Sequence, residues 1–114
     1  MAIYHVAKDW DGGELRSLAL RIDGGEIDLD DALGLIADKW TGGDIRKAEE
    51  YLDGDGRYVH CHATLAEAID YRDEWCPGGV VLAIDEGGLE VEDGQEYPHP
   101  VVRDAIPAGL IEGV

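Results

Sequence analysis

The sequence has little positive charge and no long hydrophobic run. Lys and Arg account for 9 of the 114 residues, against 26 Asp and Glu, so the formal net charge is −17. Nucleic-acid phosphates are neutralised by clustered Lys and Arg, so we expect no direct electrostatic binding of nucleic acid. No window approaches the roughly 18 apolar residues of a membrane span, and residues 1–10 lack a basic region followed by an apolar core. We expect a cytoplasmic protein that does not bind membranes.

Cysteine and serine are also scarce, which limits the available nucleophiles. Cys61 and Cys76 are too few for a disulfide scaffold. They are either paired with each other or reduced, and a reduced Cys is usually a small buried apolar residue. Neither lies in a recognisable nucleophile motif. Ser17 is the only serine and falls within a predicted helix, so a serine nucleophile is not expected.

Acidic and apolar residues are what the chain has in quantity. Hydrophobic residues make up 45% of the sequence, which is enough for a folded core, and the length suits one domain over residues 1–114. The 15 Asp and 11 Glu are spread along the chain without a block. Two interpretations stay open: a surface adapted to a cytosol of high salt, or an anionic surface that engages a basic partner.

Apolar spacing predicts helices mainly in the first two thirds of the chain. Residues 14–22, 28–40, 44–52 and 64–75 carry apolar side chains at helical intervals. Asp28 is the expected N-cap of the second helix. Thr64 and Glu67 form a capping-box pattern at the start of the fourth.

Strand patterns occur at the start of the chain, in its middle and throughout its last third. They cover residues 2–7, 57–63, 80–84, 89–91 and 96–102, and residues 106–111 close the chain. Pro98 and Pro100 place the fifth of these at an edge or in an irregular strand. The sequence therefore predicts an α+β domain in which amphipathic helices of the N-terminal half pack on a small, mainly antiparallel sheet.

The segment His60-Cys61-His62 is the most distinctive local motif. Residues two apart on a strand share a face, so His60 and His62 are able to bind one metal ion. Together with Gly54 and Glu67 their spacing matches the first metal-binding motif of the cupins. The helical pattern after Thr64 and the absence of the later cupin motif break that match. We expect no metal; His60 and His62 are the candidates if one binds.

Three segments, taken in order, resemble the ADP-ribosyltransferase fold. The chain opens with IYHV at residues 3–6, like the first strand of that family with its His. Its middle reads YVHCHATLAEA at 58–68 and VVLAID at 80–85, similar to the family's strand ending in Ser or Thr, its helix and its hydrophobic strand. Its end reads EY at 96–97, VV at 101–102 and IPAGLI at 106–111, similar to the catalytic Glu ahead of a strand and the closing segment.

The resemblance implies an NAD-binding protein that transfers ADP-ribose to a macromolecule or hydrolyses NAD. It implies that His5 binds a ribose of NAD, that Glu96 is the catalytic carboxylate and that Thr64 is the structural hydroxyl of the second segment. Tyr71 is the implied stacking residue for nicotinamide, with Tyr58 as the competing choice. The carboxylate that some arginine-modifying members carry two residues before the catalytic Glu is absent, because position 94 is Gly.

Two alternatives remain beside this hypothesis. The first is a non-enzymatic acidic interaction or inhibitor protein that docks on a basic partner surface, with the exposed members of Trp10, Trp40 and Trp75 as anchors. The second is a small metal protein that uses His60 and His62, joined by His5 or His99.

Overall fold

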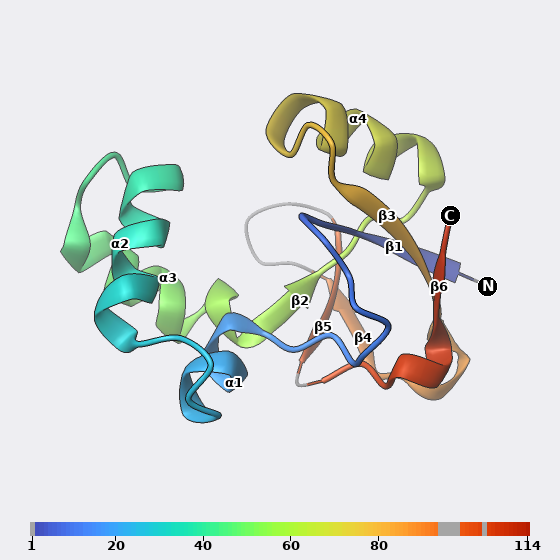
Figure 1. Ribbon diagram of the computed structural model, residues 1–114, viewed down its shortest axis with the longest axis horizontal. Helices are drawn as coiled ribbons and strands as arrows, with labels where there is room; N and C mark the ends of the chain where they lie inside the picture. Colours follow the sequence, from blue (N-terminus) through green and yellow to red (C-terminus); the bar gives the residue numbers. More distant parts are fainter. Residues whose placement is uncertain (1, 94–98, 104) are drawn as a thin grey trace.

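Two antiparallel sheets of three strands each form the centre of the fold (Figure 1). The computed structural model describes residues 2–93, 99–103 and 105–114. The first sheet has the order β1-β3-β6, with strands Ala2–Ala7, Val80–Asp85 and Ile111–Gly113. The second has the order β2-β5-β4, with strands Tyr58–His60, Pro100–Arg103 and Val91–Asp93. The small mainly antiparallel sheet predicted from the sequence is therefore two sheets.

The two sheets are joined by the segment that follows β2. The Cys61 N–H donates to the Pro100 carbonyl oxygen at 2.9 Å, which continues the pairing with β5. One residue later, Tyr4 and His62 exchange backbone hydrogen bonds of 2.9 and 2.6 Å, which tie the segment to β1. The strand predicted over 57–63 is thus shorter, at Tyr58–His60, because its second half turns from one sheet to the other.

The larger hydrophobic core lies between the sheets. Antiparallel register places Ile3 opposite Ile84 and Val59 opposite Val102. The buried apolar side chains of this core come from both sheets and from the segments that connect them: Ile3, Val59, Cys61, Leu82, Ile84, Val102, Ile106 and Ile111. Each such side chain contributes about 1.5–3 kcal/mol on burial, so this core is the main source of stability.

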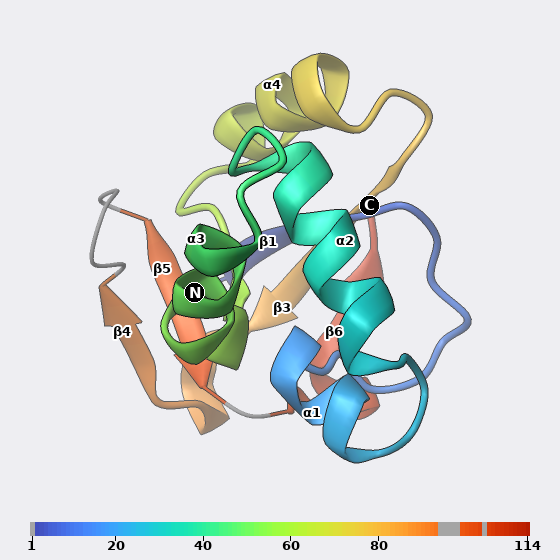
Figure 2. The same cartoon turned by 90° about the vertical axis from the view of Figure 1, so that its left-hand side faces the viewer.

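A second, smaller core holds together three helices that we call the helical unit. These are α1 (Leu18–Asp23), α2 (Leu29–Lys39) and α3 (Ile45–Asp53). Their buried residues are Leu33, Ile36, Ala37 and Ala48. Figure 1 shows this unit beside the sheets, and Figure 2 shows α2 and α3 at the front of the molecule. The rest of the described structure, the two sheets with the fourth helix, is called the sheet unit.

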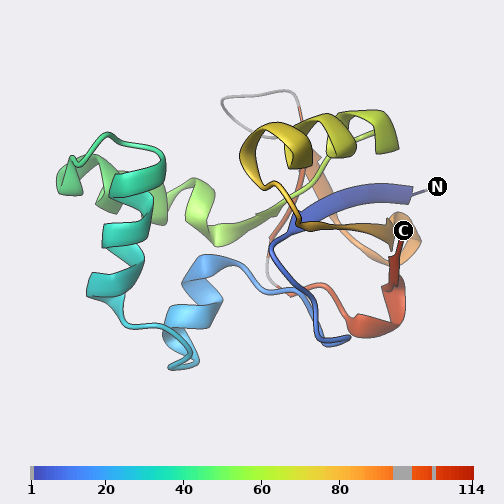
Figure 3. The same ribbon diagram turned by 45° about the horizontal axis from the view of Figure 1, so that its top comes forward.

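The fourth helix, α4 (Leu65–Trp75), packs against β1 and β3. Figure 3 shows it lying across these strands. Its start confirms the predicted capping box, because the Thr64 hydroxyl accepts a hydrogen bond from the Glu67 N–H at 3.2 Å. Ala68 is fully buried on its inner face.

The first helix begins later than predicted, at Leu18 instead of residue 14. Ser17 caps it, since its Oγ accepts a hydrogen bond from the Leu20 N–H at 3.2 Å. Leu15 is drawn into the sheet unit, where its backbone exchanges hydrogen bonds of 3.0 and 2.7 Å with Ile106. Asp28 occupies the N-cap of α2 as predicted, but its side chain accepts no cap hydrogen bond.

The C-terminal third also departs from the prediction in detail. A single 3-10 turn over Glu86–Gly88 moves the strand predicted at 89–91 to Val91–Asp93. The closing segment is a bridge at Ile106, a 3-10 turn over Ala108–Leu110 and only then β6. Within the described residues, none of the helices is both long and apolar enough to cross a membrane.

Candidate functional site

All four histidines gather where β1 meets the segment around β2. His5 of β1 donates a hydrogen bond from Nδ1 to the backbone carbonyl oxygen of His60 at 2.7 Å. His60 Nδ1 lies 2.9 Å from His99 Nε2, just before β5. The His62 ring lies against Tyr71 of α4, with ring centroids 4.9 Å apart. Long-range pairing therefore assembles residues that are up to 94 positions apart (99 − 5).

The His60–His99 pair shares one proton. His60 Nε2 donates to the Asp55 carbonyl oxygen at 2.8 Å, so in the neutral ring Nδ1 is the acceptor for His99 Nε2–H. The ring centroids are 5.1 Å apart and the two nitrogens 2.9 Å apart, so the nitrogens lie nearly on the line between the rings. The His99 N–H therefore points at the His60 Nδ1 lone pair, and the two nitrogens do not converge on a third atom.

Burial lowers the pKa of two histidines of the cluster, His5 and His62. Desolvation lowers the pKa of His5 and outweighs the hydrogen bond to the His60 carbonyl, which acts in the opposite direction. Burial also lowers the pKa of His62, with a further contribution from nearby His99. His5 is thus neutral near pH 7. Because the His5 Nδ1–H donates to the His60 carbonyl oxygen, Nε2 of His5 carries the lone pair. That nitrogen has no hydrogen-bond partner among the described residues.

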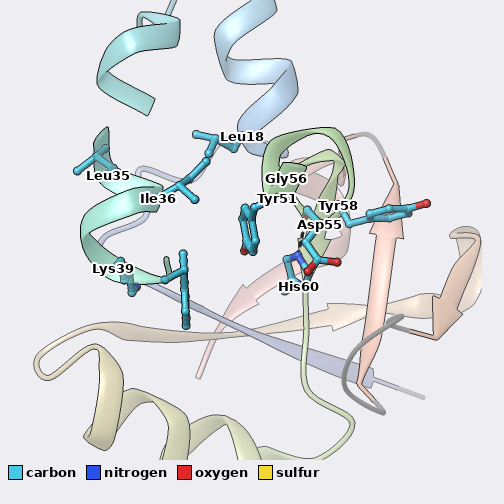
Figure 4. Close-up of a pocket in the computed structure, with 10 residues that line it drawn as sticks. Leu18, Leu35, Ile36, Lys39, Tyr51, Asp55, Gly56, Tyr58 and His60 are labelled. Carbon is cyan, nitrogen blue, oxygen red and sulfur yellow. Dashed lines mark hydrogen bonds between the residues drawn. The ribbon is translucent and has the colours of Figure 1, made fainter. Parts of the chain in front are cut away.

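A cleft of about 180 Å³ adjoins His60 between the helical unit and β2 (Figure 4). Its walls combine aromatic and apolar side chains with a few polar ones: Leu18, Leu35, Ile36, Lys39, Trp40, Tyr51, Asp55, Gly56, Tyr58 and His60. Trp40 and Tyr51 come from α2 and α3, and their planes are 16° from parallel with centroids 6.4 Å apart. Small-molecule sites have volumes of about 300–1,000 Å³, so this cleft has room for one ring of a larger ligand.

The residues predicted to bind NAD lie in three different places: at the cleft, behind His60 and at α4. Tyr58 lines the cleft, beside His60, which the sequence offered only as a metal candidate. His5 lies behind His60 and is joined to the His60 carbonyl oxygen by a hydrogen bond. Tyr71 belongs to α4 and lies against the His62 ring. Thr64 caps α4. His5, Thr64 and Tyr71 are not among the described residues that line the cleft. Glu96 lies outside the described residues.

The cysteines take no part in the cluster. Both are free, so the pairing of Cys61 with Cys76 that the sequence left open does not occur. Cys61 is fully buried in the larger core, and burial raises the pKa of its thiol to about 12. A thiol with so high a pKa is a poor nucleophile at neutral pH.

Among the residues that the structure describes, no group of three or more His, Cys, Asp or Glu side chains is arranged to hold a metal ion. His60 and His62, the metal candidates from the sequence, instead have different ring partners, His99 and Tyr71.

Sequence reasoning missed Trp40, Tyr51 and Asp55 as walls of the cleft. Trp40 was considered only as a surface anchor, and no local motif marks Tyr51 or Asp55. Comparison with protein-family models, with curated proteins and with solved structures finds no match to the chain. Its chemistry must therefore be argued from its own geometry.

Proposed function

We propose that the chain is an ADP-ribosyltransferase-like domain that binds NAD beside His5 and the cleft at His60. The observation that carries the proposal is the hydrogen bond of 2.7 Å from His5 Nδ1 to the His60 carbonyl oxygen. This bond joins His5 of the first strand to residues 58–68, the second of the three segments that resemble the ADP-ribosyltransferase fold. The order of elements supports it too: β1 with His5, the helices, β2, Thr64 capping α4, and β3.

In this proposal His5 orients a ribose. Its Nδ1–H is held by the His60 carbonyl, so Nε2 is left as an acceptor for a ribose hydroxyl. The lowered pKa of His5 keeps that nitrogen unprotonated at neutral pH. The cleft, which Trp40, Tyr51 and Tyr58 help to line, receives one ring of the dinucleotide, which suits its volume of about 180 Å³, and the remainder lies outside it.

The proposal gives Glu96 the role of the carboxylate at the reacting sugar. Bound NAD supplies a glycosidic bond that breaks with its electron pair going to nicotinamide, while the oxygen of water or of an acceptor bonds to ribose C1′ and loses a proton. A carboxylate stabilises the positive charge that develops on the sugar. His99, which belongs to the histidine cluster, follows Glu96 by three positions in the sequence.

Calorimetric titration of NAD into the full chain tests this proposal, in dilute buffer and in about 1 M KCl, where surface charge is screened. The key variant is His5→Asn, whose amide keeps the donor to His60 and lacks the acceptor at Nε2. We expect NAD binding by the wild type and a loss of at least about tenfold in affinity in His5→Asn, the energy of one hydrogen bond to a neutral group.

Glu96→Gln should retain NAD binding and lose NAD turnover, measured as nicotinamide release. Glu112→Gln removes the same charge from an exposed position of β6 and serves as its control. Absence of NAD binding at both salt concentrations, or equal affinity in wild type and His5→Asn, would contradict the proposal.

A further inference from the structure

Two tryptophans from different units form an exposed patch beside the cleft. Trp40 ends α2 and Trp75 ends α4, and their ring centroids are 6.1 Å apart with planes at 38°. They are 43% and 51% exposed. Leu35, which lines the same cleft as Trp40, is 61% exposed. We call Leu35, Trp40 and Trp75 the tryptophan patch. Residues that dominate binding energy at protein interfaces are enriched in tryptophan, tyrosine and arginine, so an exposed pair of tryptophans is a candidate docking surface.

Exposed carboxylates lie next to the two tryptophans in the sequence. Asp38 and Asp44 flank Trp40 in the sequence, and Glu74 directly precedes Trp75; all three are exposed. Ion pairs within the described residues involve only the carboxylates of Glu14, Glu26, Asp53 and Asp73. Asp38, Asp44 and Glu74 therefore have no ion-pair partner in the described part of the chain, although Asp44 accepts a hydrogen bond from the Lys47 N–H at 3.2 Å as the N-cap of α3. A cationic partner is able to pair with these carboxylates.

The patch already holds a cation of its own. The Lys39 ammonium lies 5.0 Å from the centroid of the Trp40 ring, the geometry of a cation–π contact. Arginine does this better than lysine, because its flat guanidinium stacks on an indole face and at the same time donates to carboxylates. The combination of exposed indoles with carboxylates beside them therefore fits arginine side chains.

We infer that the tryptophan patch docks an arginine-bearing segment of a partner protein. Charge selects this occupant: with a net charge of −17, the chain repels a second copy of itself, nucleic acid and anionic lipid. The inference does not depend on NAD binding, because it uses neither His5 nor Glu96.

The test is a titration of the full chain with a short peptide that alternates arginine and serine, followed by tryptophan fluorescence and calorimetry. A lysine–serine peptide of equal length is the matched probe. We expect the arginine peptide to bind more tightly at about 0.15 M salt and to keep part of its advantage at about 1 M, where simple charge attraction is screened. Trp75→Ala should weaken arginine-peptide binding about tenfold.

Two control variants separate docking from general attraction to an acidic protein. Trp10→Phe changes a half-buried tryptophan whose Nε1 donates to the Gly13 carbonyl oxygen at 2.8 Å, and it should leave peptide affinity unchanged. Glu74→Gln should weaken binding more than Glu112→Gln, which removes an equal charge from β6.

The inference is wrong if the arginine peptide does not bind, if it binds Trp75→Ala as tightly as the wild type, or if the two glutamate variants weaken it equally. Tryptophan-dependent binding of anionic vesicles or single-stranded DNA, or dimerisation lost in Trp75→Ala, would also overturn it, because each identifies another occupant.

Discussion

The helical unit and the sheet unit bury their apolar residues to different extents. The larger core contains eight buried residues, mostly Ile, Val and Leu, whereas the core of the helical unit has four, of which two are alanines. Leu29, Leu35, Trp40 and Ile45 of the helical unit or its ends are 43–61% exposed. Stability thus resides mainly between the sheets, while the helical unit supplies a wall of the cleft and half of the tryptophan patch. Regions with few buried contacts open at the lowest free energy.

The largest effect on stability is expected in the sheet unit. Ile84 is fully buried and lies on β3 between β1 and β6. Ile84→Ala should lower the free energy of unfolding by about 4 kcal/mol, because it removes buried methyl groups and leaves a cavity. Urea unfolding measures it, with Val80→Ala at an exposed position of the same strand as the control. If Ile84→Ala lowered the free energy of unfolding no more than Val80→Ala does, the claim that stability resides mainly between the sheets would be contradicted.

The matching change in the helical unit should cost less. Ile36 is 3% exposed in the smaller core, and Ile36→Ala should lower the free energy of unfolding by about 2 kcal/mol, at the low end for such a truncation. Hydrogen exchange should show faster opening of α2 and α3 and little change in β1 and β3. An equal acceleration in both units would mean that they unfold as one.

A backbone contact in the sheet unit should produce an effect of similar size. A Cβ on Gly79 would lie 2.7 Å from the Ala7 carbonyl oxygen and 2.9 Å from the Cys76 carbonyl oxygen, so backbone must move. We expect Gly79→Ala to cost about 2 kcal/mol, from overpacking. Gly34→Ala, where a Cβ would meet open space in α2, is the control and should be neutral or stabilising. Unchanged thermal stability in Gly79→Ala would contradict this packing.

Loss of the cap on α4 should be milder. Thr64→Ala removes the hydroxyl that accepts from the Glu67 N–H and should cost about 1 kcal/mol. Thr64→Ser keeps the hydroxyl and should preserve most of the stability in urea unfolding. If both variants lose the same amount, the methyl group and not the cap is responsible.

The smallest effect is a pH dependence that belongs to the sheet unit. The pKa of His5 is lower in the folded chain than its ordinary value of 6.5 because of burial. As pH falls below that value the unfolded chain binds a proton that the folded chain does not, so stability is full above about pH 6.5 and declines below it. The free energy of unfolding, measured from pH 7 down to pH 5, should therefore decline more steeply in the wild type than in His5→Asn. Parallel curves would contradict the burial of His5.

Sequence reasoning succeeded where the determinants are local. The strand predicted over 80–84 is found at Val80–Asp85, and the Thr64–Glu67 capping box is found as predicted. Both features depend on neighbouring residues. Sequence reasoning failed where one segment pairs with two distant strands. The segment 57–63 was predicted as a single strand, but pairing of His62 with Tyr4 divides it between two sheets, and no local pattern encodes that partner.

The candidate site was predictable only in part for the same reason. His5, His60, His62 and Tyr58 were singled out from motifs, and His5 and His60 do meet. The walls formed by Trp40 and Tyr51 depend on how the helical unit packs against β2, which is a tertiary property. Spacing alone likewise could not predict that Trp75 is exposed and Trp10 half-buried, because each lies at or near the end of an apolar segment.

Hydrogen exchange of the full chain with and without NAD tests most directly the claim that a nucleotide site lies between the two units. We predict that NAD slows exchange in β1 around His5, in the segment around His60 and at the end of α2 near Trp40, and leaves β6 unchanged. At an NAD concentration near the wild-type dissociation constant, His5→Asn should lose most of this protection. Identical exchange with and without saturating NAD, or protection confined to β4 and β6, would contradict the account.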